Sequence, residues 1–217
     1  RCAPIILQGP AIEPCQRFGV PIAIHEDLIA LGKGFCQEGI SSTPEQVVLF
    51  RRVDDRWLEE ARIEPPESHG RGIFGASVAI SGDRLVVGAP VLSGSGSGTS
   101  MAHVCRRLVS GWVHEAVLHP EGLDEPAAFG RSAAMDGDVV VIGATLANAA
   151  WVFRRRGLNW EEEAKLQNPQ SGGPERFGWS VAIARNTILV GDTSFTGVDA
   201  HYGGVTLFRR IAQQWIM

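Results

Sequence analysis

The residues best suited to ligand chemistry gather mainly in the second half of the chain. An indole stacks on a sugar or an aromatic ring, while guanidinium, carboxylate and imidazole groups hydrogen-bond a ligand or exchange protons with it. One short segment combines several of these types and holds Tyr202, the only tyrosine. We predict a ligand-binding set of nine residues: Trp179, Arg131, Asp192, Phe195, Asp199, His201, Tyr202, His69 and Arg71.

No established catalytic motif organises these residues. The sequence has no Gly-x-Ser-x-Gly, no His-Glu-x-x-His and no phosphate-binding glycine loop. The glycine–serine run at 94–98 lacks the lysine and the helix of a phosphate loop, so we interpret it as a flexible linker. A binding site is therefore favoured. The alternative is an enzyme with one pocket built from His201, Asp192, Asp199, Arg131 and Trp179.

A repeated unit must position these residues. Phe-Gly begins at Phe18, Phe74, Phe129 and Phe177, roughly 50 residues apart. Each unit continues with an apolar run that ends in glycine, an Arg-Arg pair and a tryptophan. The apolar runs are too short for helices and are rich in Val and Ile, which indicates strands. Four short antiparallel strands per unit are typical of a propeller blade, so the sequence predicts an all-β propeller.

The shared markers also have expected structural roles. The repeated tryptophan (Trp57, Trp112, Trp160 and Trp215) is predicted to cover the join between blades. The Arg-Arg pairs are interpreted as solvated strand edges, in which one arginine of each pair lays its stem over apolar surface and keeps its charged head in water. Trp151 falls inside a third strand and is predicted to belong to the core, and Cys105 replaces the phenylalanine before one Arg-Arg pair and is predicted to be buried.

We predict one domain spanning residues 1–217, with blades at about 18–66, 74–120, 129–169 and 177–217. The last unit stops soon after its tryptophan, and residues 5–10 are similar to the end of an outer strand at 164–169. The segment 1–17 is therefore predicted to supply a closing strand that ties the first blade to the last in a ring of four. The alternative is that the four units form part of a larger ring.

The strand order places two sets of loops on opposite faces of the ring. The loops between second and third strands share one face with the loops between blades, and the hairpin turns share the other. The long segments 33–45, 91–100 and 195–202 fall on the first face, where variable loops usually carry function. Trp179 begins an innermost strand at this face, near Arg131 and Asp192. Two structural alternatives stay open: Trp179 could fill a narrow channel, and Arg131 could pair with Asp192.

The order of markers resembles FG-GAP repeats, the repeats of the integrin α-subunit propeller. The residues that carry the resemblance are Phe-Gly, Ser-Val-Ala-Ile, Asp-x-Leu-Val-Val-Gly-Ala-Pro and Trp-x-x-Glu-Ala-x-Leu. The family includes adhesion receptors and lectins, so the resemblance implies the fold more firmly than the function. It also implies calcium loops between first and second strands, but turns such as Ser81-Gly82-Asp83 offer at most two carboxylates. We therefore predict no metal and no cofactor.

Composition narrows the partners. The formal net charge is −4 and no basic face is evident, so we predict no nucleic-acid partner. No apolar segment approaches the length of a membrane-spanning helix. Cys2 and Cys15 flank the predicted closing strand and could form a disulfide, whereas a zinc site has little support.

We predict a non-enzymatic, lectin-like binding module, extracellular or periplasmic, that uses the long-loop face. Its partner would be a carbohydrate, another small molecule or a protein, and its oligomeric state is left open. A purely structural role is a third alternative.

Overall fold

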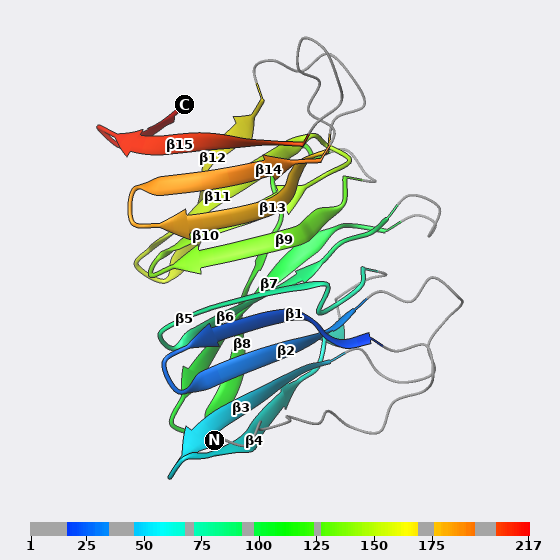
Figure 1. Cartoon of the computed structure of the whole chain (residues 1–217), viewed down its shortest axis with the longest axis vertical. Coiled ribbons are helices and arrows are strands. Elements are labelled where there is room, and N and C mark those ends of the chain that lie inside the picture. Colours follow the sequence, from blue (N-terminus) through cyan, green and yellow to red (C-terminus); the bar gives the residue numbers. More distant parts are fainter. Residues whose placement is uncertain are drawn as a thin grey trace, which may run out of the picture.

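The computed structural model describes residues 17–34, 46–67, 72–92, 98–123, 127–168, 176–193 and 203–217. The described residues form four separate sheets, and each sheet consists of four consecutive antiparallel strands (Figure 1). The predicted all-β propeller fold with four blades is confirmed. The described part of the chain holds no helix that could span a membrane.

Each blade is numbered in chain order. Blade 1 contains β1 (Arg17–His25), β2 (Leu28–Gly34), β3 (Val47–Val53) and β4 (Arg56–Ile63). Blade 2 contains β5 (Ser77–Ser81), β6 (Arg84–Ala89), β7 (Met101–Leu108) and β8 (Gly111–Leu118). Blade 3 contains β9 (Phe129–Asp136), β10 (Val139–Ala144), β11 (Ala149–Arg156) and β12 (Asn159–Gln167). Blade 4 contains β13 (Phe177–Ala184), β14 (Thr187–Asp192), β15 (Gly204–Ile211) and β16 (Gln214–Ile216).

The second strand of an internal blade is buried on both faces. All six residues of β6 and of β10 are buried, which explains why these strands are continuous apolar runs instead of alternating patterns. Tight two-residue turns precede them, with positive φ at Gly82 and Gly137. These turns lie at one end of each blade, at the left in Figure 1, and the starts of the innermost strands lie at the opposite end.

Adjacent blades share their cores. Separate apolar clusters join blade 1 to blade 2, blade 2 to blade 3 and blade 3 to blade 4. Each cluster contains the Phe-Gly phenylalanine of the later blade, and Phe74, Phe129 and Phe177 are all fully buried. Three of the four repeated tryptophans pack there as predicted, since Trp112, Trp160 and Trp215 each lie against one of the three clusters. Trp57 packs instead against a cluster within blade 1.

The glycine that ends the second strand is required by the neighbouring blade. A Cβ on Gly143 would lie 2.1 Å from the carbonyl oxygen of Gly178, and a Cβ on Gly88 would lie 2.1 Å from that of Gly130. Only glycine allows such a close approach of two backbones. The glycine that ends the second strand of one blade therefore contacts the Phe-Gly glycine of the next blade, which explains why both are repeated.

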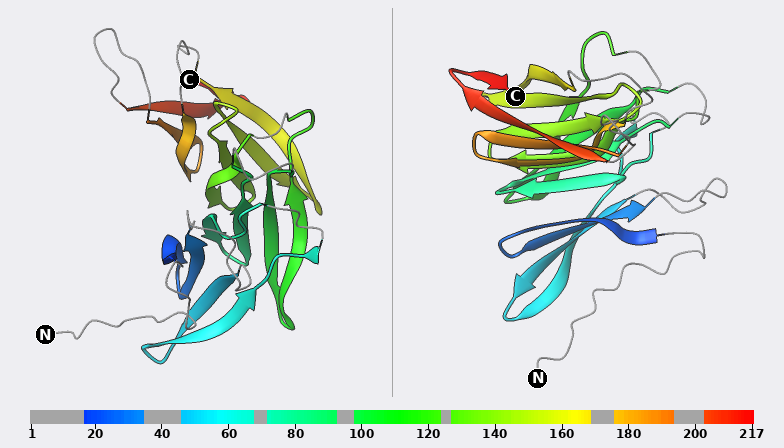
Figure 2. Two further views of the ribbon diagram at one scale, coloured as in Figure 1. Left: turned by 90° about the vertical axis from the view of Figure 1, so that its right-hand side faces the viewer. Right: turned by 45° about the horizontal axis from the view of Figure 1, so that its top comes forward.

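The four blades form an arc with blade 1 and blade 4 at its two ends (Figure 2). The substantial contacts between innermost strands join β1 to β5, β5 to β9 and β9 to β13. The predicted closing strand within 1–17 and the Cys2–Cys15 disulfide lie essentially outside the described residues, so both stay predictions. In blade 4, β16 pairs with β15 at Arg209, Arg210 and Ile211.

Candidate functional site

Trp179 and Arg131 meet at the long-loop end of the innermost strands. They occupy equivalent positions in neighbouring blades, each directly after the Phe-Gly glycine, and β9 and β13 lie side by side. The Arg131 Cζ atom lies 4.5 Å from the centroid of the Trp179 ring, which is a cation–π contact. Trp179 is 36% exposed. The predicted neighbourhood of these two residues is therefore found.

A second arginine joins them. The Arg176 Cζ atom lies 5.6 Å from the same indole, and the Trp179 backbone N–H donates to the Arg176 carbonyl oxygen at 3.2 Å. Burial lowers the pKa of Arg131, and the positive charge of Arg176 lowers that pKa further. Two like charges thus share one aromatic ring, and no ion pair to either guanidinium is found among the described residues.

Asp192 holds the backbone at this site. Its side chain is buried, and its Oδ1 atom accepts a hydrogen bond from the Arg176 backbone N–H at 3.1 Å. Nearby, the Asn148 Oδ1 atom accepts a hydrogen bond from the Phe177 backbone N–H at 2.9 Å. These two bonds fix the segment that enters β13. The suggested Arg131–Asp192 ion pair is not found, because Arg131 stacks on Trp179 instead.

The other predicted site residues cannot be placed. His69, Arg71, Phe195, Asp199, His201 and Tyr202 lie outside the described residues. The described site therefore consists of Trp179, Arg131 and Arg176, positioned by Asp192. Arg176 was not predicted, although its place directly before Phe-Gly-Trp is a departure from Ile73 and Ala128 in blades 2 and 3.

An open hollow of about 470 Å³ lies next to this cluster on blade 4, lined in part by Ser180, Gly191, Asp192 and Val205. A second hollow, of about 520 Å³, lies between β8 and β12 on the outer rim and is lined in part by glutamates. The first hollow borders the cationic cluster through Asp192.

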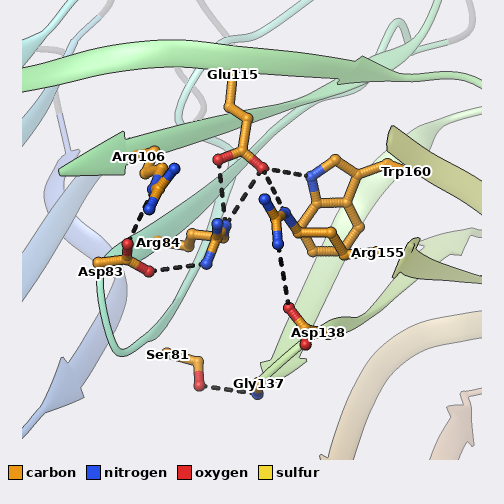
Figure 3. Close-up of polar contacts among 9 residues, drawn as sticks. All are labelled: Ser81, Asp83, Arg84, Arg106, Glu115, Gly137, Asp138, Arg155 and Trp160. Carbon is orange, nitrogen blue, oxygen red and sulfur yellow. Dashed lines mark hydrogen bonds and ion pairs between the residues drawn. The ribbon is translucent and has the colours of Figure 1, made fainter. Parts of the chain in front are cut away.

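A further set of polar side chains forms a repeated hydrogen-bonded group between blades, which we call a clasp. In each clasp, one glutamate accepts hydrogen bonds from an arginine and a tryptophan of the following blade. In Figure 3, Glu115 of β8 accepts hydrogen bonds from the Trp160 Nε1 atom at 2.9 Å and from the Arg155 Nε atom at 3.2 Å. Trp160 and Arg155 belong to blade 3, while Arg84 of blade 2 completes the group at 3.2 Å. The turns meet as well, because the Gly137 backbone N–H donates to the Ser81 Oγ atom at 2.9 Å.

The same clasp recurs at the other two junctions. Glu60 of blade 1 accepts hydrogen bonds from Arg107 and Trp112 of blade 2, and Glu163 of blade 3 accepts them from Arg210 and Trp215 of blade 4. In every case the glutamate stands three residues after the tryptophan of its own blade. The interpretation of the Arg-Arg pairs as solvated edges is therefore wrong for Arg107, Arg155 and Arg210, the second arginines of blades 2 to 4, which join neighbouring blades. In blade 1, Arg52 pairs with Asp27 of its own blade and is about half exposed.

Burial by itself would raise the pKa of Glu115. Hydrogen bonds from Trp160 and Arg84, together with the charges of Arg84 and Arg155, outweigh that effect, and the pKa is lowered. The pKa values of Glu60 and Glu163 are lowered by the same balance. All three carboxylates are therefore held ionised as structural acceptors.

Two further predictions concern buried residues. Trp151 is 3% exposed and packs edge-on against Phe129, so its predicted core position is confirmed. Cys105 is buried as predicted, and burial, with a contribution from Glu115, raises the pKa of its thiol to about 12. The His103 and His114 rings are joined by a hydrogen bond of 2.9 Å, and burial lowers the pKa of His114. His103 is fully buried in β7, whereas His114 is exposed on β8.

Among solved structures, the chain is similar to the Bombyx mori GH32 beta-fructofuranosidase BmSUC1, with 12% identity and a TM-score of 0.48. A mutant of the same enzyme in complex with sucrose gives 14% identity and a TM-score of 0.49. Each match covers 93% of this chain and 50% of the other chain, so this chain spans half the length of these structures. No curated protein matches the chain.

The FG-GAP repeat family model matches residues 57–104, 112–153 and 160–203, which together make up more than half of the chain. The matches begin at Trp57, Trp112 and Trp160. Each matched unit therefore starts with the outer strand of one blade and continues into the next blade, so it includes the glutamate of a clasp and the Phe-Gly that follows. The chain belongs to the FG-GAP repeat family.

Proposed function

We propose that this chain is a non-enzymatic recognition module that binds a carboxylate-bearing ligand at the Arg131–Arg176–Trp179 cluster. The carboxylate would belong to an acidic sugar or to an acidic side chain of a protein partner. Family membership supports an extracellular or periplasmic setting for such a module.

The observation that carries this proposal is the pairing of two arginines on one indole. A half-buried guanidinium beside a second positive charge is unfavourable, as the lowered pKa of Arg131 reflects. An incoming carboxylate would relieve this repulsion, and guanidinium groups bind carboxylates through paired, charge-assisted hydrogen bonds. The exposed part of the Trp179 ring would pack against the apolar part of the ligand.

The enzyme alternative has less support from the described residues. General acid–base catalysis needs a titratable group that is free to exchange a proton with the ligand. The described carboxylate at this site, Asp192, is buried and accepts a hydrogen bond from the Arg176 backbone. The described cluster thus offers charge recognition and stacking rather than an acid–base pair.

Thermal unfolding with acidic and neutral ligands tests the proposal. The 217-residue chain would be unfolded with three sets of compounds: glucuronate and galacturonate, Asp/Glu-rich peptides, and the neutral sugars glucose and galactose. Acidic compounds should raise the melting temperature, since binding to the folded state stabilises it. Neutral sugars should not, and the sugar and peptide arms distinguish the two ligand sources.

Variants locate the effect. Arg131→Gln should abolish the ligand-induced shift while leaving the unliganded protein at least as stable, because it removes one of two repelling charges. Arg156→Gln is the matched control, because Arg156 is exposed and pairs with Glu161 in β12. Stabilisation that persists in Arg131→Gln, or no stabilisation by any acidic compound, would show that the cluster is not the binding site.

A further inference from the structure

The two end blades of the arc each leave one apolar face uncovered. On blade 1, Ile22 and Ile24 of β1 are each 67% exposed. On blade 4, Val205 of β15 is 68% exposed, and Leu189 and Leu207 are also exposed. Ile22 and Ile24 alternate along β1, the innermost strand of blade 1, and Leu189, Val205 and Leu207 lie on β14 and β15, the central strands of blade 4. Side chains two residues apart on a strand point to the same side, so they form faces instead of isolated surface positions.

The blade 4 face is buried in every earlier blade. Strand register places Leu189 opposite Leu207 in blade 4, and the corresponding pairs are Val86–Val104 in blade 2 and Val141–Val152 in blade 3. Those four valines have no exposed surface, because each pair packs against the following blade. Val205 pairs with Gly191, as Ala102 pairs with Gly88, and Ala102 is also fully buried.

The blade 1 face is the complementary half of the same junction. Ile22 and Ile24 correspond by register to Val78 and Ile80 of blade 2. Both of the latter are buried against blade 1. Blade 1 therefore presents the face that normally receives a preceding blade, and blade 4 presents the face that normally receives a following one.

Polar groups on blade 4 are also arranged for a following blade. The Ser77 Oγ atom donates to the Gly130 carbonyl oxygen of blade 3, and the Ser132 Oγ atom donates to the Gly178 carbonyl oxygen of blade 4, both at 2.8 Å. Ser180 is the equivalent serine of blade 4 and is exposed. The three atoms nearest to a Cβ on Gly191 all belong to Ser180, and none belongs to another blade. The hollow of about 470 Å³ is lined by both of these residues.

We propose that the uncovered face of blade 4 docks blade 1 of a second copy of this chain, head to tail, and that two arcs thereby close a ring of eight blades. In this contact Ser180 would donate to the Gly19 carbonyl oxygen of the second copy, as Ser77 and Ser132 donate at the junctions of blades 2 and 3 and of blades 3 and 4. A head-to-tail contact uses two different surfaces, and it closes when the rotation between copies returns to the start.

A second copy is favoured over closure within one chain by the shape of the arc. Figure 2 shows blade 1 and blade 4 at opposite ends, with the open side of the arc between them. Two copies would cover both faces of both arcs with one type of contact, and eight blades fall within the range that propellers adopt. This inference is independent of the proposed ligand site, which lies at the internal junction of blades 3 and 4.

Light scattering after size exclusion tests the inference on the 217-residue chain. The expected species is a dimer of the 23.4 kDa chain. Two double variants should each give monomers, with the dissociation constant of the dimer raised on the order of 100-fold. They are Ile22→Asp/Ile24→Asp on the blade 1 face and Val205→Asp/Leu207→Asp on the blade 4 face. These side chains are exposed in the single chain, so folding, checked by circular dichroism, should be retained. Leu158→Asp, at an exposed turn, is the control and should stay dimeric.

Mixing the two monomeric variants gives the sharpest outcome. Each variant retains the face that the other has lost, so the mixture should form a heterodimer through one intact contact. Gly191→Ala is a milder variant that adds one methyl group where the Gly19 carbonyl would approach, and it should also weaken the dimer. Any of four results would overturn the eight-bladed ring: a monomeric wild type, a dimer that survives both face variants, a mixture that stays monomeric, or an open polymer.

Discussion

Glu60, Glu115 and Glu163 each hold two blades together with a single carboxylate. Each is largely buried and accepts hydrogen bonds from an arginine and a tryptophan of the following blade. An arginine of the same blade as the glutamate completes each group. Because several donors converge on one acceptor, the cost of burying the charge is offset, and the lowered pKa values show that ionisation is favoured.

Glu115→Gln should therefore destabilise the fold by about 2–3 kcal/mol, since it leaves Arg84 and Arg155 without their counter-charge. Urea unfolding at neutral pH measures the effect. Glu161→Gln is the matched control in β12, where the Arg156 pair is half exposed and should contribute less than about 1 kcal/mol. The difference between the variants should shrink in acid, below the ordinary glutamate pKa of about 4.3, because a lowered pKa adds stability only above the unfolded value. Equal losses at neutral pH would contradict the importance of the clasp.

At the scale of the strand, the glycine that ends each second strand shows how one blade fits the next. Gly143 and Gly191 face a serine of their own blade in the same way, with a hypothetical Cβ at 2.3 Å from the Oγ atom. Of these two glycines, Gly143 also faces the backbone of a neighbouring blade, with the Gly178 carbonyl oxygen at 2.1 Å, whereas the three atoms nearest to a Cβ on Gly191 all belong to Ser180. A side chain at Gly143 would therefore force the two blades apart.

Gly143→Ala should lower the free energy of unfolding by at least about 2 kcal/mol, because the added methyl group overlaps a backbone that cannot move away cheaply. Gly191→Ala serves as the control, since it repeats the contact with serine and lacks the contact between blades. Both variants would be unfolded thermally in dilute solution. A loss for Gly191→Ala as large as that for Gly143→Ala would place the effect within the blade rather than at the junction.

At the scale of the whole molecule, the arc is a linear array in which each blade packs on its sequence neighbours. Stability in such arrays comes from nearest-neighbour interfaces, so a blade with one interface is held less firmly than a blade with two. Blades 2 and 3 have two interfaces among the described residues, whereas blades 1 and 4 have one each.

Hydrogen exchange should reflect this difference. In dilute solution, the amides of β2 and β14 should exchange faster than those of the corresponding strands β6 and β10, because the end blades open locally at a lower free energy. Mass spectrometry of exchanged peptides measures the rates. Equal protection of all four second strands would mean that the chain unfolds as a single cooperative unit.

Much of the local structure could be predicted from the sequence. Cys105 replaces the phenylalanine of the repeat and Trp151 falls inside a third strand, so the sequence predicts that both are buried, and both are. The repeated tryptophans are predicted at the blade joins, and Trp112, Trp160 and Trp215 lie there. The environment of the second arginines could not be predicted in this way, because Arg155 and its partner Glu115 lie 40 residues apart in the sequence. The same holds for the Arg131–Trp179 contact, which depends on how two sheets pack.

The sequence alone determined the number of blades, the order of strands and the places of the turns. These follow from local patterns: a repeated Phe-Gly, short apolar runs and turn residues that act within a few positions of the chain. Only the tertiary structure decided which side chains meet across the junctions, that Arg176 joins Trp179, and that blades 1 and 4 each present one apolar face. The physical reason is that these contacts depend on the angle and distance between separately folded sheets, which no local pattern encodes.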